Sequence, residues 1–417
     1  MTQAPKGTYD VLPQDMERRR TLHTHAERIL GAAGYQRIET PVFEATELFA
    51  RGVGESTDIV QKEMYTFDDG GGRSLTLRPE GTAPVCRAYI EHGMHKLPQP
   101  VKLWYLSCFF RAEQPQKGRY RQFWQVGAEA IGSESPETDA EIILLLAELL
   151  DAMGVKGTRL RLASLGTPET RQEYRDELTA YLRANEPELS SEVRARIDLN
   201  PMRAFDASDP GTRRVMAAAP KLLDRLAPDD AEHFQQVRAL LDVAGIPYEL
   251  DPTLVRGLDY YTRTLFEFTS DALGAQSGVG GGGRYDRLIE QLGGHSTPGI
   301  GFAAGLERIL LAGPEPPMAR DAVDLLVIVG DRDARPAHLA AFELAREARR
   351  AGLAAQLELY GRSIKSALKH ADRIDARYVA IVNDGEESSL KDMETGDQRE
   401  LARMAVIPAI LRGSKLV

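Results

Sequence analysis

The stretch "FRAEQPQKGRYRQFWQVGAE", residues 110–129, strongly constrains how this chain can fold. Pro115 and Gly118 mark a turn with strand-like residues on both sides. After the turn, alternate side chains would share one face of an extended strand. The apolar face would carry Tyr120, Trp124, Val126, Ala128 and Ala130, and the polar face Arg119, Arg121, Phe123, Gln125, Gly127 and Glu129. The pattern predicts a β-hairpin with one face in a hydrophobic core.

The polar face of this hairpin needs an explanation, because guanidinium and carboxylate groups are costly to bury without partners. The incoming limb adds Arg111 and Glu113, so residues 111–121 hold four basic side chains and one acidic one. The whole chain, in contrast, has a formal net charge of −10. Two interpretations follow from the residues alone: a solvated edge with internal ion pairs, or a site that binds an anion.

Length and composition narrow the class of protein. A chain of 417 residues exceeds what one hydrophobic core usually supports, so we expect two or three domains. The negative net charge argues against a protein that coats nucleic acid non-specifically. Apolar runs such as residues 142–146 are too short to cross a bilayer, and no leader-like segment is evident. We therefore expect a cytoplasmic protein that has no membrane partner.

Metal-ligating residues are sparse. Cys86 and Cys108 are the only cysteines, too few for a disulfide framework and without the partners of a zinc site. His92 and His95 have a possible ligand spacing, but no third ligand is evident nearby. We predict no metal held by protein ligands.

The first half of the chain alternates between helical and strand-like patterns. Apolar residues at helical spacing predict helices over residues 13–34 and 135–154. Short β-like runs cover residues 101–106, 123–131 and 159–163. These patterns favour a mainly antiparallel sheet flanked by helices.

The second half contains an interruption and a change of architecture. Residues 167–244 are charged, rich in Ala and Leu, and broken by prolines, which predicts an inserted helical module. Strand patterns resume at 264–269 and 299–303, so the sheet is interrupted and then continued. The segment "AGPEPPMARDA", residues 312–322, has the composition of a linker.

A separate small α/β domain is predicted after this linker. Its pattern is β-α-β-α-β, with strands over 323–329, 356–360 and 378–382 and helices over 337–351 and 365–371. We divide the chain into domains at residues 1–320 and 321–417.

The glycine run at residues 278–283 fits the spacing G-x-G-x-x-G. It does not follow an apolar strand, and no acidic residue lies about 20 positions further on, as a dinucleotide site requires. Close approach of the backbone to a ligand is the better explanation.

Several separate segments resemble the class II aminoacyl-tRNA synthetases, and specifically the histidyl-tRNA synthetase family. Residues 110–129 look like the second class signature, "GIGFAAGLERIL" (299–310) like the third, and "GTYDVLP" with "GYQRIETPVFE" like the first. "TLRPEGTAPVCRAY" (76–89) resembles the amino-acid-binding segment, whereas "LVRGLDYYTRTLFEF" (254–268) and "SGVGGGGRYDRL" (277–288) resemble blocks peculiar to histidyl enzymes. The resemblance implies an α+β fold: an antiparallel-sheet class II catalytic core with a helical insertion, followed by an α/β anticodon-binding domain.

The resemblance also implies an activity: ATP-dependent activation of L-histidine to histidyl-adenylate, then transfer to the 3′ end of histidine tRNA. Arg111 and Arg256 would be the catalytic residues, holding the substrate carboxylate and the α-phosphate in line. The residues that would bind ATP, with its Mg²⁺, are Arg111, Glu113, Arg119, Phe123 and Arg308.

The histidine site implied by the resemblance combines acceptors for the ammonium with partners for both ring nitrogens. Glu80, Thr82 and Gln125 would meet the ammonium, while Glu129 and Tyr261 would meet the imidazole. The full set of residues expected to bind histidine is Glu80, Thr82, Gln125, Glu129, Arg256, Tyr260, Tyr261 and Tyr285.

Partners are expected on the same basis. The first signature implies a homodimer. Residues 320–417 carry 16 basic and 16 acidic side chains, so this domain repels RNA less than the rest of the chain does. A basic stripe for tRNA would comprise Arg362, Lys365, Lys369 and Arg373, although an ordinary solvated helix explains these residues equally well.

Two other functions remain open at this point. A catalytically inactive relative, such as a regulatory subunit of histidine biosynthesis, would share the core but would generally lack the C-terminal domain and some site residues. A tRNA-binding sensor would need an accompanying kinase-like segment, which this sequence does not show.

Overall fold

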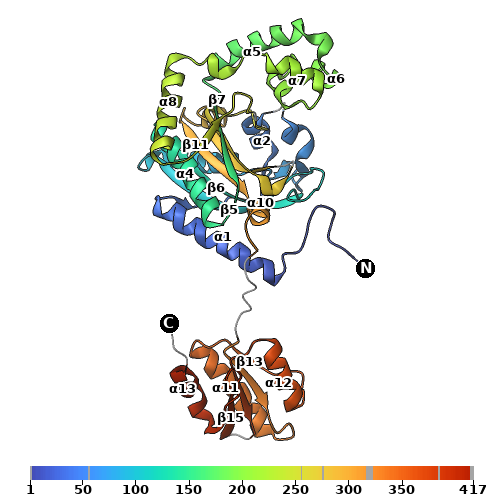
Figure 1. The fold of residues 1–417 in the computed structure, drawn as a ribbon, viewed down its shortest axis with the longest axis vertical. Coiled ribbons are helices and arrows are strands. Elements are labelled where there is room, and N and C mark those ends of the chain that lie inside the picture. The colour runs from blue at the N-terminus through green and yellow to red at the C-terminus, as the bar shows by residue number, and fades with distance from the viewer. Residues whose placement is uncertain are drawn as a thin grey trace. The chain divides into compact units, whose positions relative to one another are not determined.

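The computed structural model describes residues 2–54, 57–254, 256–274, 277–315, 323–383 and 386–413. The chain forms two compact units, Met1–Glu315 and Pro316–Val417, drawn in Figure 1. Of the predicted linker, residues 316–322 lie outside the described residues.

The first unit is built on an eight-stranded sheet. Its strand order is β1-β5-β6-β11-β10-β9-β7-β8. Only the two edge pairs, β1 with β5 and β7 with β8, are parallel. The prediction of a mainly antiparallel sheet is confirmed. The strands are β1 (Gln36–Arg37), β5 (Val101–Phe110), β6 (Gln122–Ile131), β7 (Thr158–Ser164), β8 (Tyr248–Leu250), β9 (Thr262–Ser270), β10 (Gly278–Arg284) and β11 (Gly299–Gly305).

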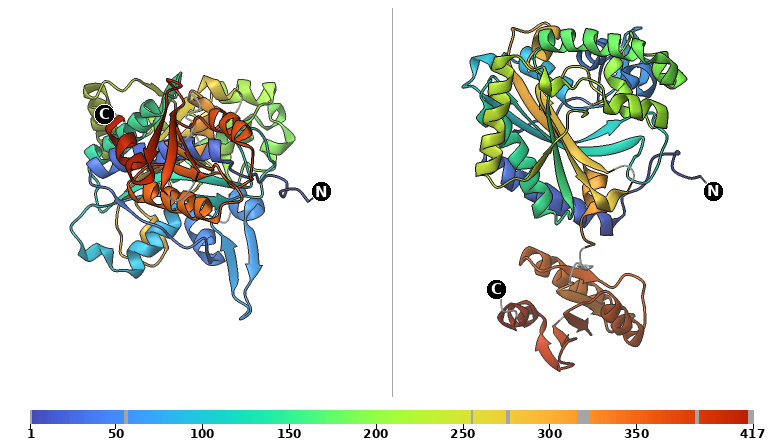
Figure 2. Two further views of the ribbon diagram at one scale, coloured as in Figure 1. Left: turned by 90° about the horizontal axis from the view of Figure 1, so that it is seen from below. Right: turned by 45° about the horizontal axis from the view of Figure 1, so that its top comes forward.

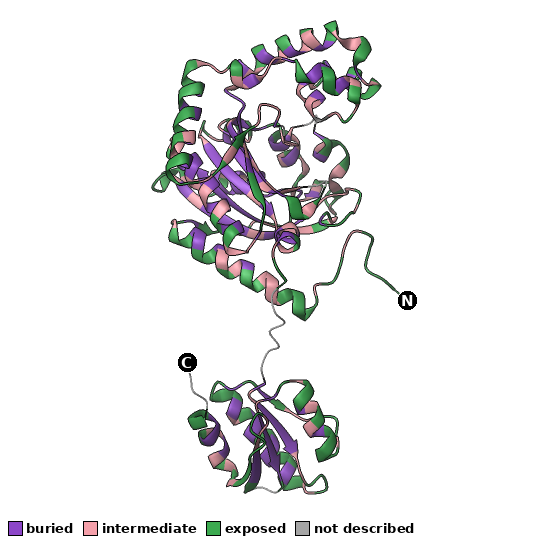
Figure 3. Cartoon of the chain, in the orientation of Figure 1, coloured by how far each residue is buried: buried purple, intermediate pink, exposed green. Residues whose placement is uncertain are grey.

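Two predicted helices cover one face of this sheet. They are α1 (Pro13–Ala32) and α4 (Pro136–Ala152), and the Ser135 side chain caps α4 by accepting a hydrogen bond from the Glu137 N–H. Their apolar residues share one core with Val126, Ala128 and Ala130 of β6. Figure 3 shows the consequence, with buried strands at the centre and helices buried along one side. The predicted apolar face of β6 is thus confirmed for these three residues.

The predicted alternation of polar and apolar side chains does not hold for the residues just before β6. Tyr120 was expected in the core, but it lies in the loop ahead of β6, where its ring stands 4.5 Å from that of Tyr9. Arg121, predicted on the polar face, donates through its Nε to the Glu113 carbonyl at 3.2 Å and through its N–H to the Gly7 carbonyl. The period-two rule holds only where strand pairing fixes the pleat.

Helices fill the range of the predicted insertion. They include α5 (Pro168–Ala184), α6 (Ser191–Arg194), α7 (Pro210–Ala217) and α8 (Pro228–Val243). The last of these, α8, is part of the main core, because Phe234, Val237 and Leu241 pack in the same cluster as α4. Figure 1 shows α8 beside the sheet and α5 to α7 further from it.

A small three-stranded sheet, β2-β4-β3, forms another part of this unit. Its strands are β2 (Phe43–Ala45), β3 (Tyr65–Asp68) and β4 (Ser74–Leu77), and α2 (Thr46–Val53) follows β2. Figure 2 shows the β3–β4 hairpin projecting from the unit. Shorter helices adjoin the main sheet: α3 (Thr82–Glu91), α9 (Leu288–Gln291) and α10 (Leu306–Ala312).

The second unit is an α/β domain with strand order β13-β12-β14-β15-β16. The predicted β-α-β-α-β pattern corresponds to β12 (Leu325–Val329), α11 (Arg335–Arg350), β13 (Ala355–Leu357), α12 (Ile364–Arg373) and β14 (Tyr378–Val382). Three further elements were missed: β15 (Glu387–Asp392), β16 (Gln398–Ala402) and α13 (Arg403–Gly413). Polar strand sequences and Pro408 inside α13 hid them.

The predicted basic stripe on this unit is only partly formed. Lys365, Lys369 and Arg373 are exposed on α12 at a spacing of four residues. Arg362 does not belong with them, because its Nη1 lies 2.7 Å from Glu358 and its guanidinium stacks on the Tyr360 ring at 4.4 Å. Arg362 therefore braces the loop that precedes α12.

No helix in the described ranges combines the length and apolar character that a membrane span requires.

Candidate active site

The structure brings most of the predicted site residues around two neighbouring cavities. The larger, of about 710 Å³, is named the cleft here. The smaller, of about 40 Å³, is named the inner cavity. Arg111, Gln125 and Arg256 line both, so these side chains stand at the junction. The other predicted residues on the cleft are Glu113, Arg119, Phe123 and Arg308, and those on the inner cavity are Glu80, Thr82, Tyr260, Tyr261 and Tyr285.

Arginines dominate the cleft, and each charge is held by a local contact. Glu113 lies between Arg111, at 3.6 Å, and Arg119, at 3.3 Å. The Arg111 guanidinium also stands over the Phe123 ring, 5.4 Å from its centroid. Arg256 pairs with Glu267 at 3.0 Å. Five arginines against three glutamates line the cleft, giving it a net positive charge of 2.

The glycine run makes room for Arg256. It forms β10, in the middle of the sheet between β9 and β11. A Cβ atom on Gly281 would lie 2.7 Å from Nη1 of Arg256 and 2.5 Å from the Phe266 carbonyl oxygen. The prediction for these glycines was close approach to a ligand; what the structure shows is that Gly281 leaves room for Arg256, a catalytic candidate from a neighbouring loop.

Arg308 enters the cleft from the start of α10. Its Nε donates to the Gly278 carbonyl at the beginning of β10, and burial lowers the pKa of its guanidinium. The preceding residue, Glu307, is buried and accepts hydrogen bonds from the Tyr9 hydroxyl at 2.8 Å and Arg19 at 3.0 Å. Glu307 also accepts the Trp124 N–H, so it ties α10 to β6 and to the N-terminal segment.

The inner cavity is bordered by the N-terminus of α3. Glu80 accepts the backbone N–H groups of Thr82 at 2.7 Å and Ala83 at 2.9 Å, which caps the helix. Burial raises the pKa of Glu80. The Thr82 hydroxyl donates to Glu129 at 2.9 Å.

Glu129 lies behind the cavity wall and is fully buried. Besides Thr82, the Tyr285 hydroxyl donates to it at 2.7 Å and that of Tyr105 at 3.4 Å. Burial raises the pKa of Glu129 to about 8. A Cβ atom on Gly301 would lie 1.8 Å from Glu129 Oε2, so glycine is required on the facing strand.

Gln125 leaves one acceptor unused at the junction. Its Oε1 atom is buried and has no hydrogen-bond partner in the described structure. A buried acceptor without a donor costs about 1–3 kcal/mol, so this position favours a ligand that brings an N–H group.

Within the described ranges, no group of three or more His, Cys, Asp or Glu side chains is arranged to hold a metal ion. The net positive charge of the cleft suits an anionic ligand.

Comparison with known proteins identifies the family. The family model for histidyl-tRNA synthetase matches residues 7–309, and that for the anticodon-binding domain matches residues 323–412. The chain belongs to the histidyl-tRNA synthetase family. The predicted family and fold class are thereby confirmed, and the chain is an aminoacyl-tRNA ligase.

Individual relatives agree with this assignment. The chain is 46% identical over 410 residues to the histidine–tRNA ligase of Acetivibrio thermocellus, covering 96% of this chain and 97% of that protein. The apo histidyl-tRNA synthetase of S. aureus matches in structure with a TM-score of 0.81 and 36% identity, covering 98% of this chain and all of that one. A Bacillus halodurans protein described as an ATP phosphoribosyltransferase regulatory subunit/histidyl-tRNA synthetase matches at a TM-score of 0.65 and 22% identity, which indicates a shared fold alone.

Sequence reasoning missed several polar residues of this synthetase site. Arg161, Glu267 and Glu307 line the cleft, and the Tyr105 hydroxyl contacts Glu129. Glu267 interrupts the apolar run of β9 and Tyr105 that of β5, a signal that was available in the sequence. Their partners could not be read from it, because strand order is not a local property.

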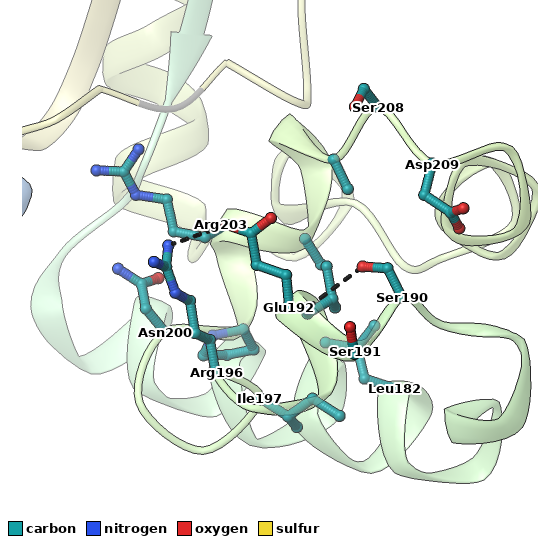
Figure 4. A pocket seen from close by; sticks show the side chains of 14 residues that line it. Leu182, Ser190, Ser191, Glu192, Arg196, Ile197, Asn200, Arg203, Ser208 and Asp209 are labelled. Carbon is teal, nitrogen blue, oxygen red and sulfur yellow. Dashed lines mark hydrogen bonds and ion pairs between the residues drawn. The ribbon is translucent and has the colours of Figure 1, made fainter. Parts of the chain in front are cut away.

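Another cavity of about 350 Å³ lies within the helical insertion of the synthetase, shown in Figure 4. Several of its polar side chains have local partners: Ser190 accepts the Val193 N–H, Asp209 accepts the Thr212 N–H, and Glu192 lies 3.8 Å from Arg196. None of the predicted site residues lines it, whereas most of them line the cleft and the inner cavity, which together form the candidate active site.

Proposed function

We propose that this protein activates L-histidine with ATP and transfers the histidyl group to the 3′ end of histidine tRNA. The observation that carries the proposal is the position of Arg111 and Arg256, which line both the cleft and the inner cavity. Two guanidinium groups at the junction of an anion-binding cleft and a tyrosine-lined pocket suit a reaction between two anions.

The physical obstacle in this reaction is repulsion. A carboxylate oxygen of histidine attacks the α-phosphorus of ATP, a P–O bond forms, and pyrophosphate leaves with the electron pair of the broken bond. Two unit charges about 4 Å apart repel by roughly 4 kcal/mol at an effective dielectric constant near 20. Arg111 and Arg256 offset this repulsion and stabilise the transition state. The nucleophile is already ionised, so no general base is needed.

ATP occupies the cleft in this proposal. Arg119 and Arg308 bind the β- and γ-phosphates together with the Mg²⁺ that accompanies the nucleotide, and Phe123 stacks on the adenine. Glu113 lies near the adenine amino group or the metal. The net positive charge of the cleft supports this arrangement.

Histidine occupies the inner cavity. Its ammonium meets Glu80, Thr82 and Gln125, and the unpartnered Oε1 atom of Gln125 supports this contact. The imidazole meets Tyr261 and Glu129, and the ring of Tyr285 closes the pocket. A site that hydrogen-bonds both ring nitrogens rejects apolar analogues, because such analogues would leave buried polar groups unpaired.

The tRNA accepts the histidyl group through its terminal ribose hydroxyl, and Lys117 in the loop before β6 contacts the acceptor stem. The second unit binds the anticodon, with Lys365 and Lys369 facing phosphates. Substituting both lysines by alanine should lower the salt slope of tRNA affinity by about 2 and leave histidine activation unchanged. Filter binding over a range of salt concentrations measures this, and an unchanged slope would remove α12 from the interface.

We also propose a cytoplasmic homodimer. Support comes from the small sheet, where Phe43 and Phe67 are 50% and 43% exposed and their rings stand 6.1 Å apart. Sedimentation velocity on the Phe43→Ser and Phe67→Ser double variant should show monomer where the wild type is dimeric.

Histidine-dependent exchange of pyrophosphate into ATP tests the activity directly. The purified wild type should catalyse exchange with histidine and show none with phenylalanine, which lacks both ring nitrogens. Absence of exchange with histidine would exclude a synthetase and favour an inactive regulatory relative.

A further inference from the structure

The segment Tyr260–Arg263 connects the inner cavity to the helical insertion. Tyr260 and Tyr261 line the inner cavity, and neither lines the cleft. Arg263, at a register shift in the pairing of β9 with β10, has a φ of 43°, in the left-handed region that non-glycine residues rarely adopt. Surrounding contacts must hold this backbone in place.

Most of those contacts come from the insertion or its junction. Nη1 of Arg171, on α5, donates to the Tyr261 carbonyl at 2.7 Å. The Arg263 N–H donates to the Gly166 carbonyl at 2.8 Å, and the Arg263 carbonyl accepts the Leu165 N–H at 2.7 Å. The backbone that carries both tyrosines is thus bonded to the start of the insertion on both sides of Thr262.

Asp230 joins the two ends of the insertion at this point. It lies near the start of α8 and is only 1% exposed. One carboxylate oxygen accepts Nε of Arg263 at 3.0 Å, and the other accepts the N–H of Thr167, the residue that caps α5, at 2.8 Å. A single buried carboxylate therefore connects α5, α8 and the strained residue next to the tyrosines.

We propose that Arg171 and Asp230 are positioning residues, through which the placement of the helical insertion sets the affinity of the inner cavity for histidine. This inference rests on the proposed function only for the identity of the ligand. It predicts that loosening the insertion weakens histidine binding and leaves ATP binding unchanged, because the tyrosines lie on the inner cavity alone.

Arg175 provides a matched control on the same helix. It lies one turn after Arg171, and its Nη2 donates to the Leu199 carbonyl at 2.9 Å, a contact within the insertion. In pyrophosphate exchange, Arg171→Met should raise the KM for histidine about tenfold, the factor that one lost hydrogen bond to a well-placed group allows. The KM for ATP and the melting temperature should stay close to the wild-type values, and Arg175→Met should change none of these quantities. Arg171→Lys, which keeps a donor, should recover part of the loss.

Amide hydrogen exchange separates this inference from the proposed function. Peptides covering residues 258–265 should exchange faster in Arg171→Met than in the wild type or in Arg175→Met, whether or not the protein activates histidine. If Arg171→Met does not fold, Asp230→Asn, which keeps the side-chain size, is measured in the same way. The inference is overturned if amide hydrogen exchange in this segment is unchanged, or if the KM for histidine stays within twofold of the wild-type value. Equal increases in the KM for histidine and ATP overturn it as well.

Discussion

The cleft and the inner cavity share four lining residues, Arg111, Gln125, Arg256 and Ala303, and otherwise differ in size and chemistry. The cleft is wide and lined by paired charges, with five arginines and three glutamates. The inner cavity is small, and apart from the shared residues its polar lining consists of Glu80, Thr82 and three tyrosines. Thr82 and Tyr285 donate hydrogen bonds to Glu129, which lies behind the cavity wall. In the proposed function, the cleft neutralises charge and the inner cavity selects its ligand by shape and hydrogen-bond pattern. A reaction between ATP and histidine needs both at one junction.

The largest effect is expected at that junction. Arg256→His should lower histidine-dependent exchange by about 10²- to 10³-fold, because the transition state loses a guanidinium placed where charge develops. The fold should persist, since Arg161 still pairs with Glu267 at 3.1 Å. Exchange assays and circular dichroism measure the two quantities. Arg159→His, in an exposed pair with Asp271, is the control. Near-normal exchange by Arg256→His would remove this residue from the mechanism.

A substitution confined to the cleft should change ATP binding alone. Arg308→Ala removes a cation that lines the cleft and does not line the inner cavity. Loss of a charged hydrogen bond costs about 1.5–3 kcal/mol, so the KM for ATP should rise roughly 10- to 100-fold while the KM for histidine changes less than threefold. Arg287→Ala, on the surface, should have no effect. Equal changes in both KM values would mean that the two cavities do not act separately.

A substitution confined to the inner cavity should have the opposite signature. Tyr285→Phe removes the hydroxyl that donates to Glu129 at 2.7 Å. We expect the KM for histidine to rise about tenfold and the KM for ATP to stay constant, from the cost of one buried unsatisfied group. Tyr89→Phe removes a comparable hydroxyl, bonded to Gln99 at 3.3 Å, and serves as the control. A rise in the KM for ATP without a rise in the KM for histidine would contradict the assignment of the two cavities.

The smallest effect concerns stability and its pH dependence. Burial raises the pKa of Glu129 to about 8, above its value in the unfolded chain, so the folded state binds the extra proton and the wild type loses stability as pH rises from about 5 to 8. Glu129→Gln lacks this titration. The unfolding free energy of the variant minus that of the wild type should therefore increase by at least about 1 kcal/mol between pH 6 and pH 8.5. Urea unfolding at several pH values measures this difference. The pH-dependent contributions of other buried acids, such as Asp139, are the same in both proteins and cancel. A pH-independent difference would show that Glu129 is ionised throughout.

Much of the fold was readable from the sequence where local patterns decide it. The alternation of Val126, Ala128 and Ala130 predicted the buried face of β6, and helical spacing predicted α1 and α4. The same rules failed at Tyr120, which precedes β6 and lines the cleft instead of the core. They also missed β15 and β16, whose sequences are too polar to show alternation.

The site was readable only in part, because its geometry depends on which strands become neighbours. Arg111 follows β5 and Arg256 lies in the loop before β9, so the two are far apart in the sequence, yet the fold places both on the same two cavities. No periodicity predicts that Glu267 faces Arg256 or that Tyr105 reaches Glu129. The resemblance to a known family identified candidate site residues, whereas the order of strands in the sheet determines which residues they contact.

The cap that Glu80 forms on α3 has a consequence for how selectivity can change. Both of its carboxylate oxygens are bound to backbone amides of that helix, so the charge cannot turn independently of the helix. On its other side, α3 buries Val85, Cys86 and Tyr89 in the core. A methyl group gained or lost beneath α3 would shift Glu80, the carboxylate that we propose binds the ammonium group of histidine. Substitutions in the hydrophobic core beneath α3 would then change the amino-acid selectivity, although no residue of the pocket had been replaced.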